Sequence, residues 1–76
     1  MSPREIEDKI LAALPGAKVE VRDLTGTGDH FSARVQSAAF EGKTRVEQHR
    51  MIYTALGAAM NGPIHALALE TEVPRV

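Results

Sequence analysis

Two capping boxes mark where helices begin in this chain, and they constrain its fold more than any other feature. In a capping box, a Ser or Thr and a Glu three residues later satisfy two backbone amides at the helix start. Ser2 and Glu5 form the first box, with Pro3 at the first helical position. We predict an amphipathic helix here, ended by Pro15-Gly16. Its inner stripe comprises Ile6, Ile10, Leu11 and Leu14.

The second box, formed by Thr44 and Glu47, predicts a longer helix. The tripeptide Asn61-Gly62-Pro63 would end it, so we expect the helix to reach about Met60. The residues that we place on its inner stripe are Val46, His49, Ile52, Tyr53, Leu56, Ala59 and Met60.

Between the two helices the hydrophobic period changes to two residues, which is typical of strands. One alternating run carries Val19 and Val21, with a twist to Leu24. A second run follows the turn-rich segment 25–30, and its apolar positions are Phe31, Ala33 and Val35. We therefore predict a hairpin of two strands joined by a glycine-rich loop.

The rest of the chain is predicted to form a bend, a third strand and a tail. Segment 37–43 is expected to bend around Phe40, with a short helical turn near residues 38–41. Segment 64–71 is apolar at nearly every position, which favours a strand flanked by neighbours over a strand at a wet edge. Its alternation separates Ile64, Ala66 and Ala68 from His65, Leu67 and Leu69. We expect residues 72–76 to be a frayed tail.

This order of elements predicts one α+β domain over residues 1–76. Helices on one face of a three-stranded mixed sheet would bury both apolar stripes. The connection from the second strand through the long helix to the third is a crossover, so we expect those two strands to be parallel.

Composition excludes several classes of function. The chain has 76 residues and no cysteine, so it is not a disulfide scaffold, a thiol redox enzyme or a self-sufficient iron–sulfur protein. Nine Lys and Arg against ten Asp and Glu argue against a surface built wholly for nucleic acid or for an anionic membrane. No apolar run approaches the roughly 18 residues of a membrane helix, and no signal peptide is visible, so we expect a cytoplasmic protein.

Short stretches that look like nucleotide-binding or catalytic motifs lack the neighbouring residues or elements that those motifs need. Gly42-Lys43-Thr44 looks like the end of a phosphate-binding loop, but the chain has Ser37 where that loop needs a glycine. Gly26-x-Gly28 lies between two predicted strands rather than between a strand and a helix, so a dinucleotide fingerprint is excluded. No nucleophile elbow or assembled base is visible, and we expect no enzymatic activity.

The three histidines are more informative, because imidazole is the one side chain here that suits a borderline or soft metal. His30 ends the glycine-rich loop, and His65 begins the predicted third strand. If the second and third strands are parallel neighbours, both histidines lie at the same end of the sheet. Histidines are more often simple polar residues, and that alternative stays open.

A basic spot surrounds the start of the long helix. It comprises Lys43, Arg45, His49 and Arg50. Such a spot can contact phosphates or an acidic partner, and a solvated helix face explains it equally well. No aromatic side chains alternate with these cations, so a stacking platform for single-stranded RNA is not supported.

Three stretches of sequence together closely resemble the BolA family. They are Phe40-Glu41-Gly42-Lys43, the run from Val46 to Tyr53, and the run from Ile64 to Thr71, which begins Ile-His-Ala-Leu. The hairpin loop Gly28-Asp29-His30-Phe31 also matches the family. The resemblance covers residues 3–71, and it implies a fold similar to the class II KH domain.

The resemblance also implies a partner and a cofactor. BolA proteins pair with monothiol glutaredoxins and can share a bridging [2Fe–2S] cluster, for which the glutaredoxin cysteine and glutathione supply thiolates. The family's ligand histidine corresponds to His65, and its loop ligand corresponds to His30. No cluster is expected in the isolated chain, which we expect to be a monomer or a weak homodimer.

A second role of the family, as transcriptional regulators, gives the alternative. It places DNA binding in the helix-turn region, which corresponds to residues 40–56. This chain lacks the Gly-x-x-Gly loop with which KH domains clamp a nucleotide backbone, and its net charge is −1. Both features weigh against that role.

Overall fold

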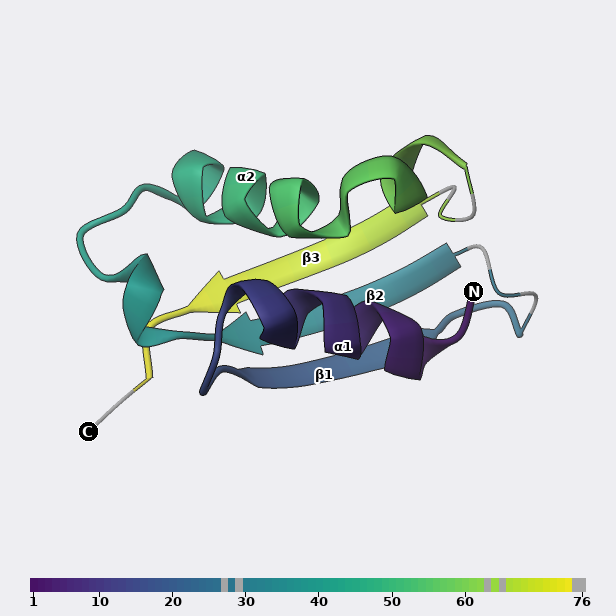
Figure 1. Ribbon diagram of the computed structural model, residues 1–76, viewed down its shortest axis with the longest axis horizontal. Coiled ribbons are helices and arrows are strands. Elements are labelled where there is room, and N and C mark those ends of the chain that lie inside the picture. Colours follow the sequence, from purple (N-terminus) through teal and green to yellow (C-terminus); the bar gives the residue numbers. More distant parts are fainter. Residues whose placement is uncertain (27, 29, 63, 65, 75–76) are drawn as a thin grey trace.

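The computed structural model describes residues 1–26, 28, 30–62, 64 and 66–74. Two α-helices, three strands and two short 3₁₀ helices follow one another along the chain (Figure 1). Their bounds are α1 Pro3–Ala13, β1 Lys18–Asp23, β2 His30–Gln36, η1 Ala38–Phe40, α2 Arg45–Leu56, η2 Gly57–Asn61 and β3 Ala66–Glu72. The predicted order of helices and strands is confirmed.

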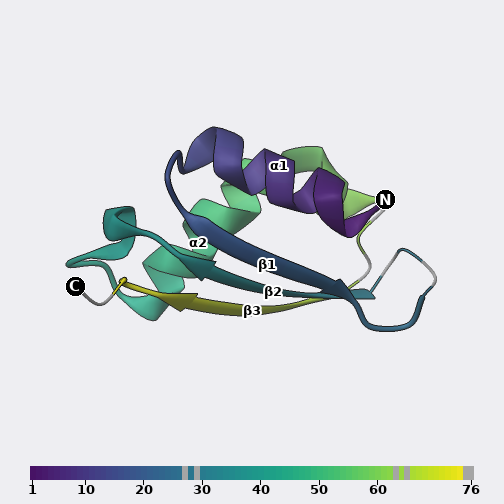
Figure 2. The ribbon, with the colours of Figure 1, turned by 90° about the horizontal axis from the view of Figure 1, so that it is seen from below.

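The sheet has the order β1-β2-β3, with β2 in the middle. β1 pairs with β2 in antiparallel fashion, and β2 pairs with β3 in parallel. Figure 2 shows the sheet nearly edge-on, with α1 on one side of it. Buried residues of both helices share one core with the inner face of β2. The mixed α+β fold and the parallel crossover are therefore confirmed, while the likeness to KH domains stays a prediction.

Both helices begin where the capping boxes place them. The Ser2 hydroxyl accepts from the Glu5 amide at 3.3 Å, and the Glu5 carboxylate accepts from the Ser2 amide at 3.2 Å. Thr44 and Glu47 form the same reciprocal pair at the start of α2. These bonds satisfy amides that a helix start otherwise leaves without partners.

One core joins the helices to the inner face of the sheet. β2 contributes Phe31 and Val35, which have no exposed surface, and η1 contributes the equally buried Phe40. The helices, the residue that follows α1 and the segment before β3 contribute Ile6, Ile10, Leu14, Ile52, Leu56, Ala59 and Ile64. The alternation in β2 and the anchoring role of Phe40 are as predicted.

The inner stripe of α2 differs from the prediction. Val46 and Tyr53 were expected inside, but their side chains are 66% and 42% exposed. Ile52 and Leu56, which belong to the predicted stripe, are buried. The α-helix ends at Leu56 rather than near Met60, and a tighter 3₁₀ helix follows it. Ala59 is buried and Met60 packs against the core as expected, so the error is confined to Val46 and Tyr53 at the flank of the stripe.

The third strand is an edge strand, which corrects the prediction that neighbours flank it. Its partner among the described residues is β2. Leu67 and Leu69 pack against the core, while Ala66 and Ala68 are exposed on the opposite face. A solvated face tolerates small alanines. The run is therefore continuously apolar because exposed alanines alternate with leucines that pack against the core.

Two further boundaries shift. Leu24 lies beyond the end of β1 and is 59% exposed, so it does not continue the inner face of the strand. Glu72 was assigned to a frayed tail but belongs to β3, where its carboxylate accepts hydrogen bonds from Arg34, at 2.9 Å, and from Gln36.

In the described part of the chain, neither helix has the length and apolar content that a membrane crossing requires.

Candidate functional site

The hairpin places His30 at the very start of the central strand. The Leu24 amide donates to the His30 carbonyl at 2.8 Å, which closes the loop directly beyond the last β1–β2 pair. The His30 residue is half-buried. An imidazole is therefore presented at one end of the sheet, beside the glycine-rich loop.

The parallel register relates this histidine to the second predicted ligand. His30 pairs with Ala66, the first residue of β3, and His65 precedes Ala66 in the chain. His65 itself lies outside the described residues. The expectation that the two strands begin at the same end of the sheet is confirmed, and the contact between the two imidazoles stays a prediction.

The side chains of this chain that suit a borderline or soft metal are its histidines. Among the residues that the structure describes, no three His, Asp or Glu side chains gather closely enough to hold a metal ion. The chain also has no cysteine. What it can supply is imidazole nitrogen, so a cluster would need thiolates from another molecule.

The basic spot at the start of α2 is divided between two faces of the helix. Arg45 and His49 line a hollow of about 400 Å³ against residues 69–72 of β3. Lys43 and Arg50 line another hollow, of about 420 Å³, against the end of α1. The four residues therefore do not form one patch, although they surround the same helix start.

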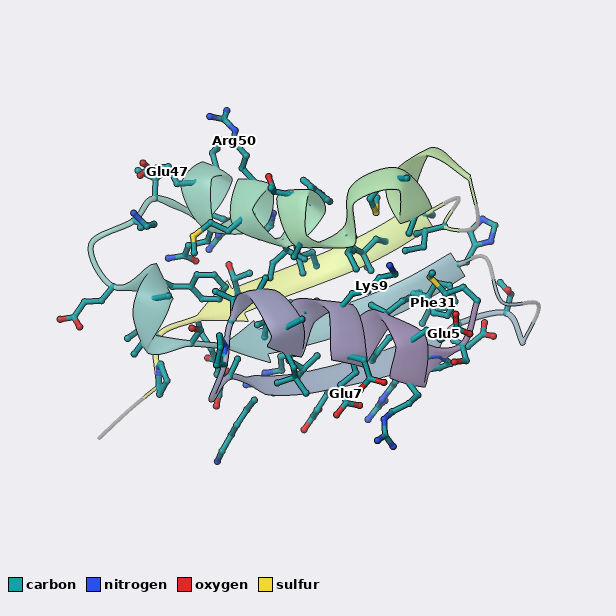
Figure 3. The ribbon with its side chains drawn as sticks, in the orientation of Figure 1. Glu5, Glu7, Lys9, Phe31, Glu47 and Arg50 are labelled. Atoms are coloured by element: carbon teal, nitrogen blue, oxygen red, sulfur yellow. The ribbon has the colours of Figure 1, made fainter. Side chains whose placement is uncertain are left out.

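Glu47 lowers the positive charge of the Lys43–Arg50 face. Its carboxylate accepts from the Thr44 amide at 2.9 Å, and this bond is the main cause that lowers the pKa of Glu47. The Thr44 side chain and the nearby Lys43 and Arg50 lower it further. Figure 3 shows Glu47 and Arg50 extending from α2 away from the sheet. The Arg45–His49 face carries no such internal carboxylate on α2, but Glu70 and Glu72 line its hollow.

Gln48 connects the turn before α2 to β3 through hydrogen bonds, and this role was not predicted from the sequence. Its side-chain amide donates to the carbonyls of Phe40 and Lys43, at 3.3 and 3.0 Å, and accepts from the Thr71 hydroxyl at 2.6 Å. No pattern in the sequence links a mid-helix glutamine to these groups. Gln48 thereby fixes the turn that carries Lys43.

The sheet face opposite the core carries alternating charges from all three strands. Arg34 lies at its centre, and the pKa of this guanidinium is raised chiefly by its hydrogen bond to Glu72. The register places Glu20 and Glu70 on either side of Arg34. Positive and negative groups therefore balance here, which does not favour phosphate binding on this face.

The elements define a small α+β domain with a three-stranded mixed sheet. A family model described as BolA-like protein matches residues 10–75. The chain belongs to the BolA family.

Two relatives and a solved structure with BolA names are similar to this chain. The DNA-binding transcriptional regulator BolA of Escherichia coli K12 is 35% identical over 78 residues, which cover 93% of this chain and 74% of that protein. BolA-like protein 1 of Homo sapiens is 33% identical over 76 residues, which cover 91% of this chain and 56% of the human protein. The chain thus spans little more than half the human relative.

The structure of a BolA protein homologue from Coxiella burnetii superposes with a TM-score of 0.83 at 36% identity. The match covers 97% of this chain and 92% of that one. The fold class expected from the sequence is that of this homologue.

Proposed function

We propose that this chain is an adaptor that binds a monothiol glutaredoxin and contributes histidine ligands to a shared [2Fe–2S] cluster. The observation that carries the proposal is the pairing of His30 with Ala66, because it brings the start of β2 beside the residue that follows His65. Membership of the BolA family supports it. The role is one of binding and transfer rather than of catalysis.

The composition of the chain sets the division of ligands. His30 and His65 would hold the iron from this side, and the glutaredoxin cysteine and glutathione would supply the thiolates. Imidazole ligation of one iron raises the reduction potential of a [2Fe–2S] centre compared with all-cysteine ligation. Without cysteine, this chain can contribute to such a centre only together with a partner that carries thiolates.

The two cationic faces of α2 are the candidate contacts for the body of the partner. Val46 and Tyr53 lie between these cations on the exposed side of the helix. An apolar pair surrounded by charges is typical of the centre of a protein interface. This favours a protein partner for this helix over a nucleic acid backbone.

Mixing the chain with a cluster-loaded monothiol glutaredoxin tests the proposal. We expect a heterodimer by gel filtration and a visible circular dichroism spectrum that differs from that of the glutaredoxin alone. His30→Ala and His65→Ala should each remove that spectral change, whereas His49→Ala should keep it at saturating protein concentrations. Unchanged spectra in both of the first two variants would show that this chain supplies no ligand.

DNA binding is the second candidate function, and two observations favour it. The E. coli relative is a DNA-binding transcriptional regulator, and Arg45 and Arg50 are exposed near the start of α2. Specific binding should weaken with added salt, and Arg45→Ala with Arg50→Ala should lower the salt slope. Binding that does not depend on DNA sequence would exclude a regulator role.

A further inference from the structure

The carboxylate of Asp23 is the centre of the glycine-rich loop. It accepts hydrogen bonds from the backbone amides of Thr25 at 3.3 Å, Gly26 at 2.9 Å and Gly28 at 2.9 Å. Both oxygens take part, since Oδ1 receives the first two bonds and Oδ2 receives the third. Hydrogen bonds to an ionised acceptor are stronger than bonds between neutral groups.

The described residues at the start of the loop are open to solvent. Leu24, Thr25 and Gly26 are exposed, and Gly26 and Gly28 adopt φ values of +74° and +78°. Glycine reaches such angles without strain, but it loses more conformational entropy on ordering than any other residue. A loop of this composition therefore depends on specific bonds rather than on packing.

A second anchor lies on the opposite side of Gly28. The N-terminal ammonium of Met1 is 3.5 Å from the Gly28 carbonyl, and a Cβ atom on Gly28 would lie 3.1 Å from the Met1 carbonyl oxygen. Gly28 is thus held by Asp23 through its amide and by Met1 through its carbonyl. His30 follows two residues later as the first residue of β2.

We propose that Asp23 is the positioning residue for His30, and that its carboxylate fixes the loop so that the imidazole is presented to the partner's cluster. This inference rests on the proposed function. Asp23 has no role as a metal ligand in this proposal, since both of its oxygens accept hydrogen bonds from the loop backbone. It acts through the loop, by holding the backbone amides of Thr25, Gly26 and Gly28.

Two substitutions separate the charge from the bonds. Asp23→Asn keeps the size of the side chain but turns one acceptor oxygen into a donor group, so it loses at least one of the three bonds. Asp23→Ala removes all of them. Asp8→Ala is the control, because Asp8 is an aspartate far from the loop whose carboxylate accepts a hydrogen bond from Arg4 within α1.

The first measurement needs no cluster. Backbone ¹⁵N relaxation of the isolated chain should give rigid order parameters, near 0.85, for Gly28 and His30, and values below about 0.6 in Asp23→Ala. Asp23→Asn should fall between the two, and Asp8→Ala should match the unmodified chain. Unchanged order parameters in Asp23→Ala would overturn the positioning role whatever the cluster does.

The second measurement is a double-mutant comparison of the visible circular dichroism of the complex with cluster-loaded glutaredoxin. We expect Asp23→Ala to shift the spectrum towards that of His30→Ala, and to add nothing when His30 is already replaced. A purely structural role would instead weaken complex formation equally in both backgrounds. If His30→Ala changes the spectrum and Asp23→Ala does not, the positioning role is wrong and the shared cluster stands. If His30→Ala changes nothing, His30 is not a ligand and both claims about it fall.

Discussion

The hydroxyl of Thr71 in β3 donates a hydrogen bond of 2.6 Å to the side-chain oxygen of Gln48 in α2. The nitrogen of the same amide donates to the carbonyls of Phe40 and Lys43, so that one side chain joins the edge strand, the 3₁₀ helix and the turn before α2. The position of Lys43 relative to β3 therefore depends on Gln48.

Replacing Gln48 should destabilise the whole fold. Gln48→Ala leaves the Phe40 and Lys43 carbonyls and the Thr71 hydroxyl without this partner, and we expect the free energy of unfolding to fall by about 1–3 kcal/mol. Thr71→Val removes one of these bonds and should cost less. Urea denaturation followed by far-ultraviolet circular dichroism measures both. A Gln48→Ala variant as stable as the original chain would contradict this role.

The phase of α2 can be tested by two matched truncations on one helix. Ile52 is fully buried and Val46 is 66% exposed. Ile52→Ala should cost about 2–5 kcal/mol, because it leaves a cavity in the core. Val46→Ala should change stability by less than about 0.5 kcal/mol. Equal losses in the two variants would place Val46 in the core and restore the stripe expected from the sequence.

Local signals predicted much of the fold. Ser2 and Thr44 start helices because capping depends on residues three apart, which the sequence displays directly. The alternation in β2 was equally readable, because its inner face is fully buried. The exposure of Val46 and Tyr53 in α2 was not readable. A valine and a tyrosine at helical spacing resemble core residues, and only the packing of the helix against the sheet decides which stripe is buried.

The candidate site was predictable only in part. His30 and the parallel register followed from the loop and the crossover, but the separation of Arg45 from Lys43 depends on how α2 sits between α1 and β3. Glu72 and Gln48 gave no local signal, since their partners lie far away along the chain. Such long-range polar contacts are set by tertiary packing rather than by any pattern of neighbouring residues.

The capping box of α2 predicts a specific response to acid. The pKa of Glu47 is lowered in the folded chain, so its contribution to stability is complete above the unfolded-state value of about 4.3 and is lost as the pH falls through the folded-state pKa. Glu47→Gln should therefore lose less stability than the original chain between about pH 5 and pH 3. Urea unfolding at a series of pH values measures this.

A companion variant separates the sources of that response. Thr44→Val removes the hydroxyl but keeps the backbone amide that donates to Glu47 at 2.9 Å, so it should retain part of the acid dependence. Parallel pH profiles for Glu47→Gln and the original chain would show that the carboxylate does not stabilise the start of the helix.

The most direct test of the central claim asks whether nitrogen from this chain is bound to iron. The chain would be labelled with ¹⁵N at histidine alone, combined with unlabelled, cluster-loaded monothiol glutaredoxin, and reduced for pulsed electron paramagnetic resonance. We expect strong ¹⁵N coupling, reduced by His30→Ala and by His65→Ala and retained in His49→Ala. A reduced cluster in a stable complex that shows no ¹⁵N coupling would contradict the proposal that this chain shares the cluster through its histidines.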